Sequence, residues 1–232
     1  MLDKSKIKAL TFDTGGTVLD WHSGFKTGFE ILKKTNNSIN NPSELANELR
    51  RRSLKVVTTQ NNSSLINFDE AHKIAVEGMI SDSKLTLNNE EIKFISFETP
   101  SLFNSWSDFI IPFNLLKASF LCVSFTLLSN RLVYLNSKRN KINWDLILSC
   151  ETLEIYKPDI EAYKKTARLL QLEPSQCLMV ACHSFDLNAA KSAGFKTVFV
   201  KRELEWGANT EINVDGDYDM IVSNFNELES LI

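Results

Sequence analysis

Short runs of hydrophobic residues that stop abruptly at polar residues recur along the chain. The first run, residues 7–12, ends at Asp13 and is followed by Gly15 and Gly16. Four later runs have the same form, and they span residues 120–128, 177–181, 197–200 and, more weakly, 220–222. Short apolar runs bounded by turn-forming residues are typical of buried strands. The pattern therefore predicts five strands.

Helical periodicity separates the later strands. Apolar residues recur at helical spacing over residues 160–170 and again over residues 187–193, where Gly194 follows as a predicted C-cap. Strands that alternate with helices form parallel sheets covered on both faces. The chain is therefore expected to have an α/β fold.

The stretch from residue 22 to residue 97 has a different character. It is rich in Asn, Ser, Lys and Glu, and no strand is predicted in it. Its apolar residues recur at helical spacing, and examples are Ile31, Leu32, Leu45, Leu49, Ala71, Ile74, Ala75 and Met79. We expect a helical cap at 22–97, inserted into a catalytic core made of residues 1–21 and 98–232. Such an insertion would lie over the carboxyl ends of the strands, where open α/β sheets bind ligands.

Composition narrows the class of protein. Among 232 residues, 43% are hydrophobic and the formal net charge is −3, which gives no indication of nucleic-acid or anionic-membrane binding. No apolar run approaches the roughly 20 residues of a membrane-spanning helix, and the first residues do not resemble a secretory signal. The four cysteines show no C-x-x-C pair and no disulfide spacing, so they are expected to be reduced core thiols. These features favour a cytoplasmic protein.

Polar residues that could carry chemistry follow the ends of the predicted strands or the turns between them. They are Asp13, Thr17, Ser129, Asn130, Lys157, His183 and Asp186. A parallel sheet would bring these loops together, and a buried carboxylate there needs a counter-charge or hydrogen bonds. Lys157 is the best candidate counter-ion for Asp13, with Thr17 and Ser129 as hydroxyl donors. The grouping suits an ionised Asp13 acting as a nucleophile.

Each of these residues alone also has a purely structural explanation. Asp13 before two glycines could form a turn, Ser129 and Asp186 could cap helices, Lys157 could be a solvated charge, and His183 could be a satisfied core histidine. The order and spacing of the whole set favour the functional interpretation.

The set resembles the four motifs of the haloacid dehalogenase superfamily. The first motif is matched by Phe12-Asp13-Thr14-Gly15-Gly16-Thr17, and the second by Leu127-Leu128-Ser129-Asn130. The third is matched by the lysine of Tyr156-Lys157-Pro158-Asp159, and the fourth by the loop from Val180 to Leu187. All four occur in order over nearly the whole chain. The resemblance implies a Rossmann-like parallel-sheet core with a helical cap.

The details are similar to one branch, the L-2-haloacid dehalogenases of type II. Phosphatases of the superfamily carry a second Asp two residues after the nucleophile, which protonates the leaving group. Gly15 stands there in this chain, and a halide leaving group needs no proton. The fourth loop offers Asp186 without a neighbouring carboxylate, so a Mg²⁺ site looks underfilled. The resemblance implies no metal and no cofactor.

In that branch, the nucleophilic Asp displaces halide from a small 2-haloacid, and water then hydrolyses the enzyme ester to release a 2-hydroxy acid. The resemblance implies that Asp13 is the nucleophile, that Lys157 holds it ionised, and that Thr17 and Asp186 support the network. Ser129 would hold the substrate carboxylate, together with backbone N–H groups after Asp13. The remaining substrate- and halide-binding positions implied by the resemblance are Arg50, Asn130, Tyr163, Gly15, Phe185, Phe68 and Leu54. A homodimer is implied as well, with a small-molecule substrate and neither nucleic acid nor membrane as a partner.

Three departures from the branch leave alternatives open. Gly15 replaces an aromatic residue that walls the pocket, and Ala181 and His183 replace a usual Ser and Asn. We hypothesise that His183 is the base for the hydrolytic water, oriented by Asp20 or Asp186. The alternatives to a dehalogenase are a Mg²⁺-dependent phosphohydrolase acting on a small phosphate ester and a catalytically silent member of the superfamily.

Overall fold

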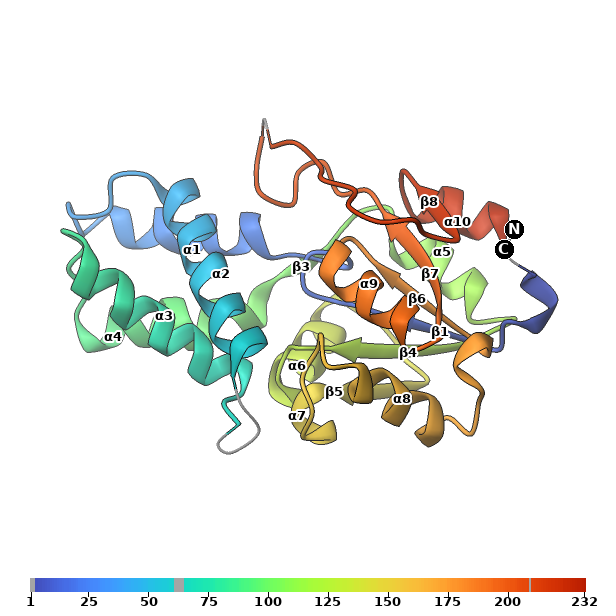
Figure 1. Cartoon of the computed structure of the whole chain (residues 1–232). Helices are drawn as coiled ribbons and strands as arrows, with labels where there is room; N and C mark the ends of the chain where they lie inside the picture. Colours follow the sequence, from blue (N-terminus) through green and yellow to red (C-terminus); the bar gives the residue numbers. More distant parts are fainter. Residues whose placement is uncertain (1–2, 61–64, 209) are drawn as a thin grey trace.

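The computed structural model describes residues 3–60, 65–208 and 210–232. A six-stranded sheet with its helices forms one part of the molecule, and a group of helices forms the other part (Figure 1). The predicted α/β fold with an N-terminal helical region is confirmed. Within the described residues, no helix is long and apolar enough to cross a membrane.

The sheet has the strand order β5-β4-β1-β6-β7-β8, and all its neighbouring strands are parallel. The six strands are β1 (Ala9–Phe12), β4 (Leu121–Thr126), β5 (Leu146–Ser149), β6 (Cys177–Ala181), β7 (Lys196–Val200) and β8 (Met220–Val222). Because β1 lies between β4 and β6, the loops after these three strands meet at one edge of the sheet. Open α/β sheets bind ligands at the carboxyl ends of the strands, at the point where the strand order reverses direction.

Helices cover both faces of this sheet. On one face, Phe12 of β1 packs against Phe113 of α5 (Ile110–Leu116) and Phe225 of α10 (Phe225–Leu231). On the other face, Phe125 of β4 packs against Tyr163 of α8 (Ile160–Leu169). The remaining helices of this part are α6 (Asn130–Asn140), α7 (Cys150–Leu153), α9 (Ser184–Ser192) and the 3₁₀ turns Lys4–Lys6 and Pro174–Gln176. All residues of β1 and β6 are buried, as expected for central parallel strands.

The helical part follows β1 and a short strand, β2 (Leu19–Asp20). Its elements are α1 (Trp21–Lys33), α2 (Pro42–Thr59), α3 (Phe68–Asp82), α4 (Asn89–Lys93), a π-helical turn (Phe94–Glu98) and a 3₁₀ turn (Thr99–Leu102). Local sequence sets the starts of these helices: Asn41 caps α2 ahead of Pro42, and Asn67 with Glu70 forms a capping box on α3. The chain returns to the sheet through β3 (Asn104–Ser105), which pairs antiparallel with β2. The division of the chain into a cap at 22–97 and a core stays a prediction.

The structure corrects three details of the sequence-based expectation. It contains β5, which lies over a short apolar run that was not among the five predicted strands. It also contains the two-residue ribbon of β2 and β3. Ile31 and Ile74 were expected on the buried faces of their helices but are 48% and 42% exposed.

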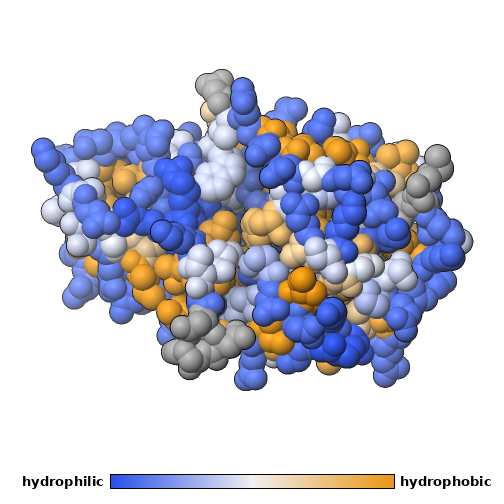
Figure 2. All heavy atoms as spheres, viewed as in Figure 1, coloured by the Kyte–Doolittle hydropathy of each residue, from blue (hydrophilic) through white to orange (hydrophobic). Residues whose placement is uncertain are grey.

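The outer surface is mostly polar on the face seen in Figure 2. Hydrophobic side chains come to the surface there at the junction between the helical part and the sheet part. The four cysteines of the chain are free thiols and all are buried, in agreement with their predicted role as reduced core residues.

Candidate active site

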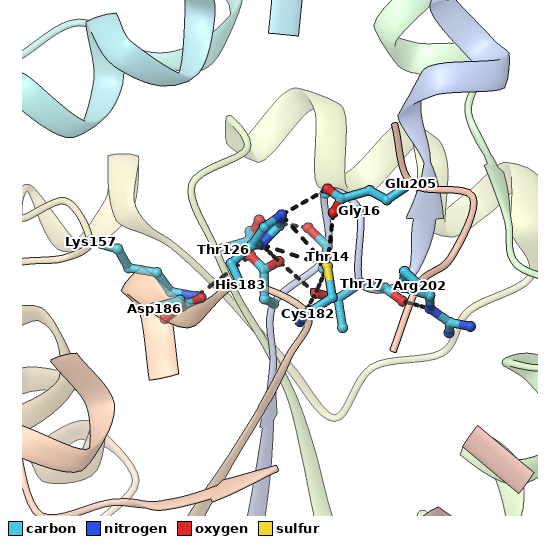
Figure 3. Close-up of polar contacts among 12 residues, drawn as sticks. Thr14, Gly16, Thr17, Thr126, Lys157, Cys182, His183, Asp186, Arg202 and Glu205 are labelled. Atoms are coloured by element: carbon cyan, nitrogen blue, oxygen red, sulfur yellow. Dashed lines mark hydrogen bonds and ion pairs between the residues drawn. The ribbon is translucent and has the colours of Figure 1, made fainter. Parts of the chain in front are cut away.

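Asp13 lies at the carboxyl end of β1, between the loops that follow β4 and β6. Its backbone N–H donates to the carbonyl oxygen of Val180, which extends the pairing with β6 by one residue. The residue is 5% exposed. Its Oδ2 accepts a 2.8 Å hydrogen bond from the Thr17 hydroxyl and lies 3.2 Å from Nδ1 of His183, whose ring is drawn in Figure 3.

Lys157 connects Asp13 to a second buried carboxylate. Its ammonium nitrogen lies 3.6 Å from Asp13 Oδ1 and 2.6 Å from Asp186 Oδ2, and it also donates to the carbonyl oxygen of Phe125. The lysine side chain is fully buried. Tyr163 donates from its hydroxyl to the other oxygen of Asp186, at 2.6 Å. Lys157 is thus held between two carboxylates, with hydrogen bonds to Asp186 and the Phe125 carbonyl oxygen and an ion pair to Asp13.

This network keeps Asp13 ionised. Burial alone raises the pKa of the Asp13 carboxyl, but the charge of Lys157 and hydrogen bonds from His183 and Thr17 outweigh burial, so the pKa lies well below its usual value. For Lys157, burial lowers the pKa, but the charges of Asp186 and Asp13 outweigh it and the pKa is raised. An unprotonated carboxylate paired with a protonated lysine is the state that a nucleophilic aspartate needs.

His183 is held between Asp13 and a carboxylate that the sequence analysis did not identify. Its Nε2 lies 2.8 Å from Glu205 Oε1 (Figure 3). Trp21 donates to the same oxygen from Nε1 at 2.9 Å. Burial lowers the pKa of His183, but Cys182, Glu205 and the hydrogen bond to Asp13 raise it more, and the pKa lies well above its usual value. Glu205 stands in the loop after β7.

The carboxylate that orients His183 is therefore Glu205, rather than Asp20 or Asp186. Asp20 accepts from the backbone of Ser23 as the N-cap of α1, and Asp186 is bonded to Lys157 and Tyr163. The loop that carries Glu205 is held in place by Arg202, which donates from Nε to the Thr17 carbonyl oxygen at 2.9 Å.

Arg50 brings a positive charge from α2 to the same place. The residue is 4% exposed, and its Nη2 donates to the carbonyl oxygen of Gly15 at 2.9 Å. Its guanidinium carbon lies 5.3 Å from the centre of the Trp21 ring and 5.5 Å from that of Phe68. Among the described residues, Arg50 Nε has no hydrogen-bond partner. A buried, unpartnered N–H on a cation is suited to an anionic ligand.

A small cavity adjoins these groups, with a volume of about 10 Å³, which is room for about one water molecule. It is lined by Asp13, Gly15, Arg50, Leu54, Phe68, Thr126, Leu127, Leu128, His183 and Phe185. Seven of these lining residues were predicted from the sequence, and they come together at this cavity. They are Asp13, Gly15, Arg50, Leu54, Phe68, His183 and Phe185. The mixture of a carboxylate, a guanidinium and apolar walls suits a small ligand with a polar and an apolar end.

Three predicted site residues lie elsewhere in the structure. Ser129 is buried, and its hydroxyl donates to Asp69 of α3 at 2.6 Å. Asn130 is bonded through its backbone and side-chain nitrogens to Glu151. Both residues line a neighbouring cavity of about 1060 Å³ between α3 and α6. Tyr163 contacts Asp186, so its place is behind Lys157 rather than on the cavity wall.

The donor set around Asp13 does not fit the Mg²⁺ ion of the phosphatases. Asp186 and Asp13 face the Lys157 ammonium, and the Gly15 carbonyl oxygen accepts from Arg50. A divalent cation beside these oxygens would be repelled by both cationic side chains. We therefore derive no catalytic step through a magnesium ion.

Comparisons with known proteins find similarity to haloacid dehalogenases. A family model described as haloacid dehalogenase-like hydrolase matches residues 130–200. (S)-2-haloacid dehalogenase 4A of Burkholderia cepacia is 36% identical over 59 residues, which are 25% of this chain and 26% of that enzyme. The crystal structure of an L-2-haloacid dehalogenase superposes with a TM-score of 0.87 at 26% identity, covering 97% of this chain and 98% of the other. A defluorinating L-2-haloacid dehalogenase has the same fold, with a TM-score of 0.87 at 24% identity over 97% of this chain and 94% of its own.

The chain belongs to the haloacid dehalogenase superfamily. Within that superfamily, its fold matches that of L-2-haloacid dehalogenases over nearly the whole chain.

Proposed function

We propose that this protein hydrolyses small 2-haloalkanoic acids to 2-hydroxy acids through an ester on Asp13, without a metal ion. The observation that carries the proposal is the state of Asp13: a buried, lysine-paired carboxylate that opens onto a small cavity next to Arg50. The fold shared with L-2-haloacid dehalogenases supports the same reaction class.

In the first step, an oxygen of Asp13 attacks the carbon that bears the halogen. The new carbon–oxygen bond forms as the carbon–halogen bond breaks, and the halide leaves with the bonding electrons. Lys157 keeps the attacking carboxylate ionised and oriented, while Thr17 and His183 hold its Oδ2. Arg50 lines the cavity, and it would stabilise the departing halide through its unpartnered Nε.

In the second step, water attacks the carboxyl carbon of the Asp13 ester. His183 takes one proton of the water and returns it to the substrate oxygen as the bond between that oxygen and the carboxyl carbon breaks, which releases the 2-hydroxy acid. The second proton of the water leaves the new Asp13 carboxyl to solvent. The free enzyme holds His183 as an imidazolium between two carboxylates. Ester formation removes the charge of Asp13, which lowers the pKa of His183 and prepares it to act as a base.

The roles of Ser129 and Asn130 in holding the substrate remain part of the proposal. Because Ser129 bonds Asp69 of α3, it can turn to a substrate carboxylate only if that contact breaks. A three-carbon acid also needs more space than one water molecule, so the residues that line the cavity must move apart to admit it. A homodimer is likewise proposed, and sedimentation velocity tests it.

The phosphohydrolase alternative receives no support from the site. Gly15 supplies no acid for a leaving alkoxide, and two oxygens beside Asp13, those of Asp186 and the Gly15 carbonyl, are already bonded to Lys157 and Arg50.

Single-turnover mass spectrometry tests the proposal. The enzyme is incubated with a limiting amount of 2-chloropropionate in oxygen-18 water, with a chelator present, and then digested. The ester route puts the label into the peptide that contains Asp13 and releases chloride. Release of chloride with the label only in the product would reject the Asp13 ester, and no turnover of any 2-haloacid would favour the silent alternative. The Asp13→Asn variant is the matched control.

A further inference from the structure

Cys182, His183 and Glu205 form a cluster that the proposed reaction does not fully use. The first two follow directly after β6, and the third lies in the loop after β7. One donor atom from each residue lies within 4.8 Å of the other two. Figure 3 shows the three side chains pointing toward one another.

The separations match those of a tetrahedral zinc site. Zn–S bonds of about 2.3 Å and Zn–N or Zn–O bonds of about 2.0–2.1 Å place tetrahedral ligands about 3.3–3.6 Å apart. Cys182 Sγ lies 3.6 Å from His183 Nε2 and 3.6 Å from Glu205 Oε2. The 2.8 Å hydrogen bond between His183 Nε2 and Glu205 Oε1 must open for an ion to bind Nε2. A thiolate, an imidazole and a carboxylate are the donors that zinc prefers.

The residues that form hydrogen bonds to the three cluster residues also suit a zinc site. Histidines that bind zinc through one ring nitrogen usually donate from the other to a carboxylate, which fixes the ring. His183 Nδ1 already lies 3.2 Å from Asp13 Oδ2. Trp21 holds Glu205 Oε1 and leaves Oε2 on the side of the thiol. The ligands are thus oriented before an ion arrives.

An ion has a route to this cluster that does not pass Asp13. Cys182, His183 and Glu205 line a cavity of about 640 Å³, whose wall also includes Arg202 and Trp206. The cavity would give a bound ion access to solvent.

We propose that Cys182, His183 and Glu205 form a binding site for one Zn²⁺ ion or a similar soft divalent cation. Binding forms Zn–S, Zn–N and Zn–O bonds, and releases to solvent the protons of the Cys182 thiol and of His183 Nε2. The ion also holds the lone pair of Nε2 and keeps the remaining proton on Nδ1, so His183 can no longer accept a proton from water. The site is therefore inhibitory, and this second part rests on the proposed function.

The test is a titration of chelator-stripped, reduced protein with Co²⁺ and, in competition with a chromogenic chelator, with Zn²⁺. One equivalent is expected to bind, and bound Co²⁺ should show the near-ultraviolet absorption of a cobalt–thiolate bond. Cys182→Ala should lose that absorption, and both Cys182→Ala and Glu205→Gln should weaken zinc binding at least about tenfold.

The matched control is Cys177→Ala, which removes a buried thiol from the other end of β6 and should leave both signals unchanged. Circular dichroism checks that each variant is folded, and Glu205→Gln keeps the test decisive if Cys182→Ala does not fold. No cobalt–thiolate absorption, or equal zinc affinity in wild type and both site variants, would overturn the proposal. Tight zinc binding without loss of turnover would uphold the site and contradict the role of His183 as the base.

Discussion

His183 and Glu205 are joined by a 2.8 Å hydrogen bond although they come from the loops after two different strands. Together with the 3.2 Å contact between His183 and Asp13, this bond makes a continuous row of carboxylate, imidazole and carboxylate at the sheet edge. Trp21 anchors the far end of the row. Since one ring nitrogen faces Asp13 and the other faces Glu205, the ring has one orientation and both of its nitrogens are used.

Replacing Glu205 should slow the hydrolysis of the ester more than its formation. Glu205→Gln keeps a hydrogen-bond acceptor but removes the charge that balances a protonated His183, so we expect the hydrolytic step to fall at least about tenfold. Rapid-quench measurements should then show a burst of halide equal to the enzyme, followed by slow turnover. Glu203→Gln, at an exposed position in the same loop, should behave as wild type. A variant that loses both steps equally would contradict a role restricted to His183.

The pH dependence of turnover should follow the protonation of His183. Its pKa lies well above the usual value, and it must be neutral to accept a proton. When ester hydrolysis limits turnover, kcat should rise with pH as the imidazolium loses its proton and then level off. Removing the negative charge in Glu205→Gln makes the imidazolium less stable, so the rising limb should move to lower pH by at least about one unit. An unmoved limb in the variant would assign the titration to another group.

Arg50 and Arg51 are neighbours in sequence that differ in burial. Variants of the two therefore test whether Arg50 binds an anion, such as the departing halide. Arg50 is buried against Gly15, whereas Arg51 is 52% exposed and pairs with Glu48. Arg50→Lys loses the planar donor set, and we expect kcat/KM for 2-chloropropionate to fall about 100-fold or more. Arg51→Lys should stay within about twofold of wild type, because exposed ion pairs contribute little. Steady-state chloride release measures both variants, and similar losses in the two would reject the assignment.

The fold was largely predictable because its signals are local. Strands buried in a parallel sheet have continuous apolar sequences. The apolar runs at 7–12 and 177–181 contain the two central strands. The edge of the sheet was harder to predict. Strand β5 has only a short apolar stretch, and its first residue is 40% exposed, so it resembled part of a loop. Ile31 and Ile74 show that helical spacing does not specify which apolar positions face the core.

Asp13 was predictable as part of the site because it directly follows a buried strand, and Lys157 and Asp186 because they belong to motifs in the segments that follow β5 and β6. Glu205 was missed because it lies in a loop that contains several charged residues, and charged loops are usually exposed to solvent. Its burial depends on Trp21 and His183, which are distant in sequence. The one available signal was that its loop also follows the end of a strand. The contact between Ser129 and Asp69 likewise depends on how α3 lies against the sheet, which sequence does not specify.

Lys157 should matter for stability as well as for chemistry. Lys157→Met leaves Asp186 buried without its partner, and removing one member of a buried ion pair costs about 3–5 kcal/mol in the free energy of unfolding. The variant should also form no ester. Lys164→Met, an exposed lysine on α8, should change stability by less than about 1 kcal/mol. Urea unfolding gives both values. Adding Asp186→Asn to Lys157→Met should restore part of the lost stability, and a double variant no more stable than the single one would argue against the ion pair as the cause.

Gly15 and Gly16 should respond differently to the same added methyl group. Gly15 does not have a left-handed backbone, and a Cβ there would lie 3.3 Å from Arg50 Nη2, so Gly15→Ala should fold normally and displace only Arg50. We expect its free energy of unfolding to change by less than about 1 kcal/mol, with kcat/KM lowered severalfold. Gly16 has φ of 101°, and a Cβ there would collide with the Glu205 carboxylate. Gly16→Ala should therefore lose at least about 1–2 kcal/mol of stability and accumulate the ester, because Glu205 no longer reaches His183. Urea unfolding and single-turnover halide release distinguish the two variants, and equal behaviour would show that the neighbouring side chains move aside without consequence.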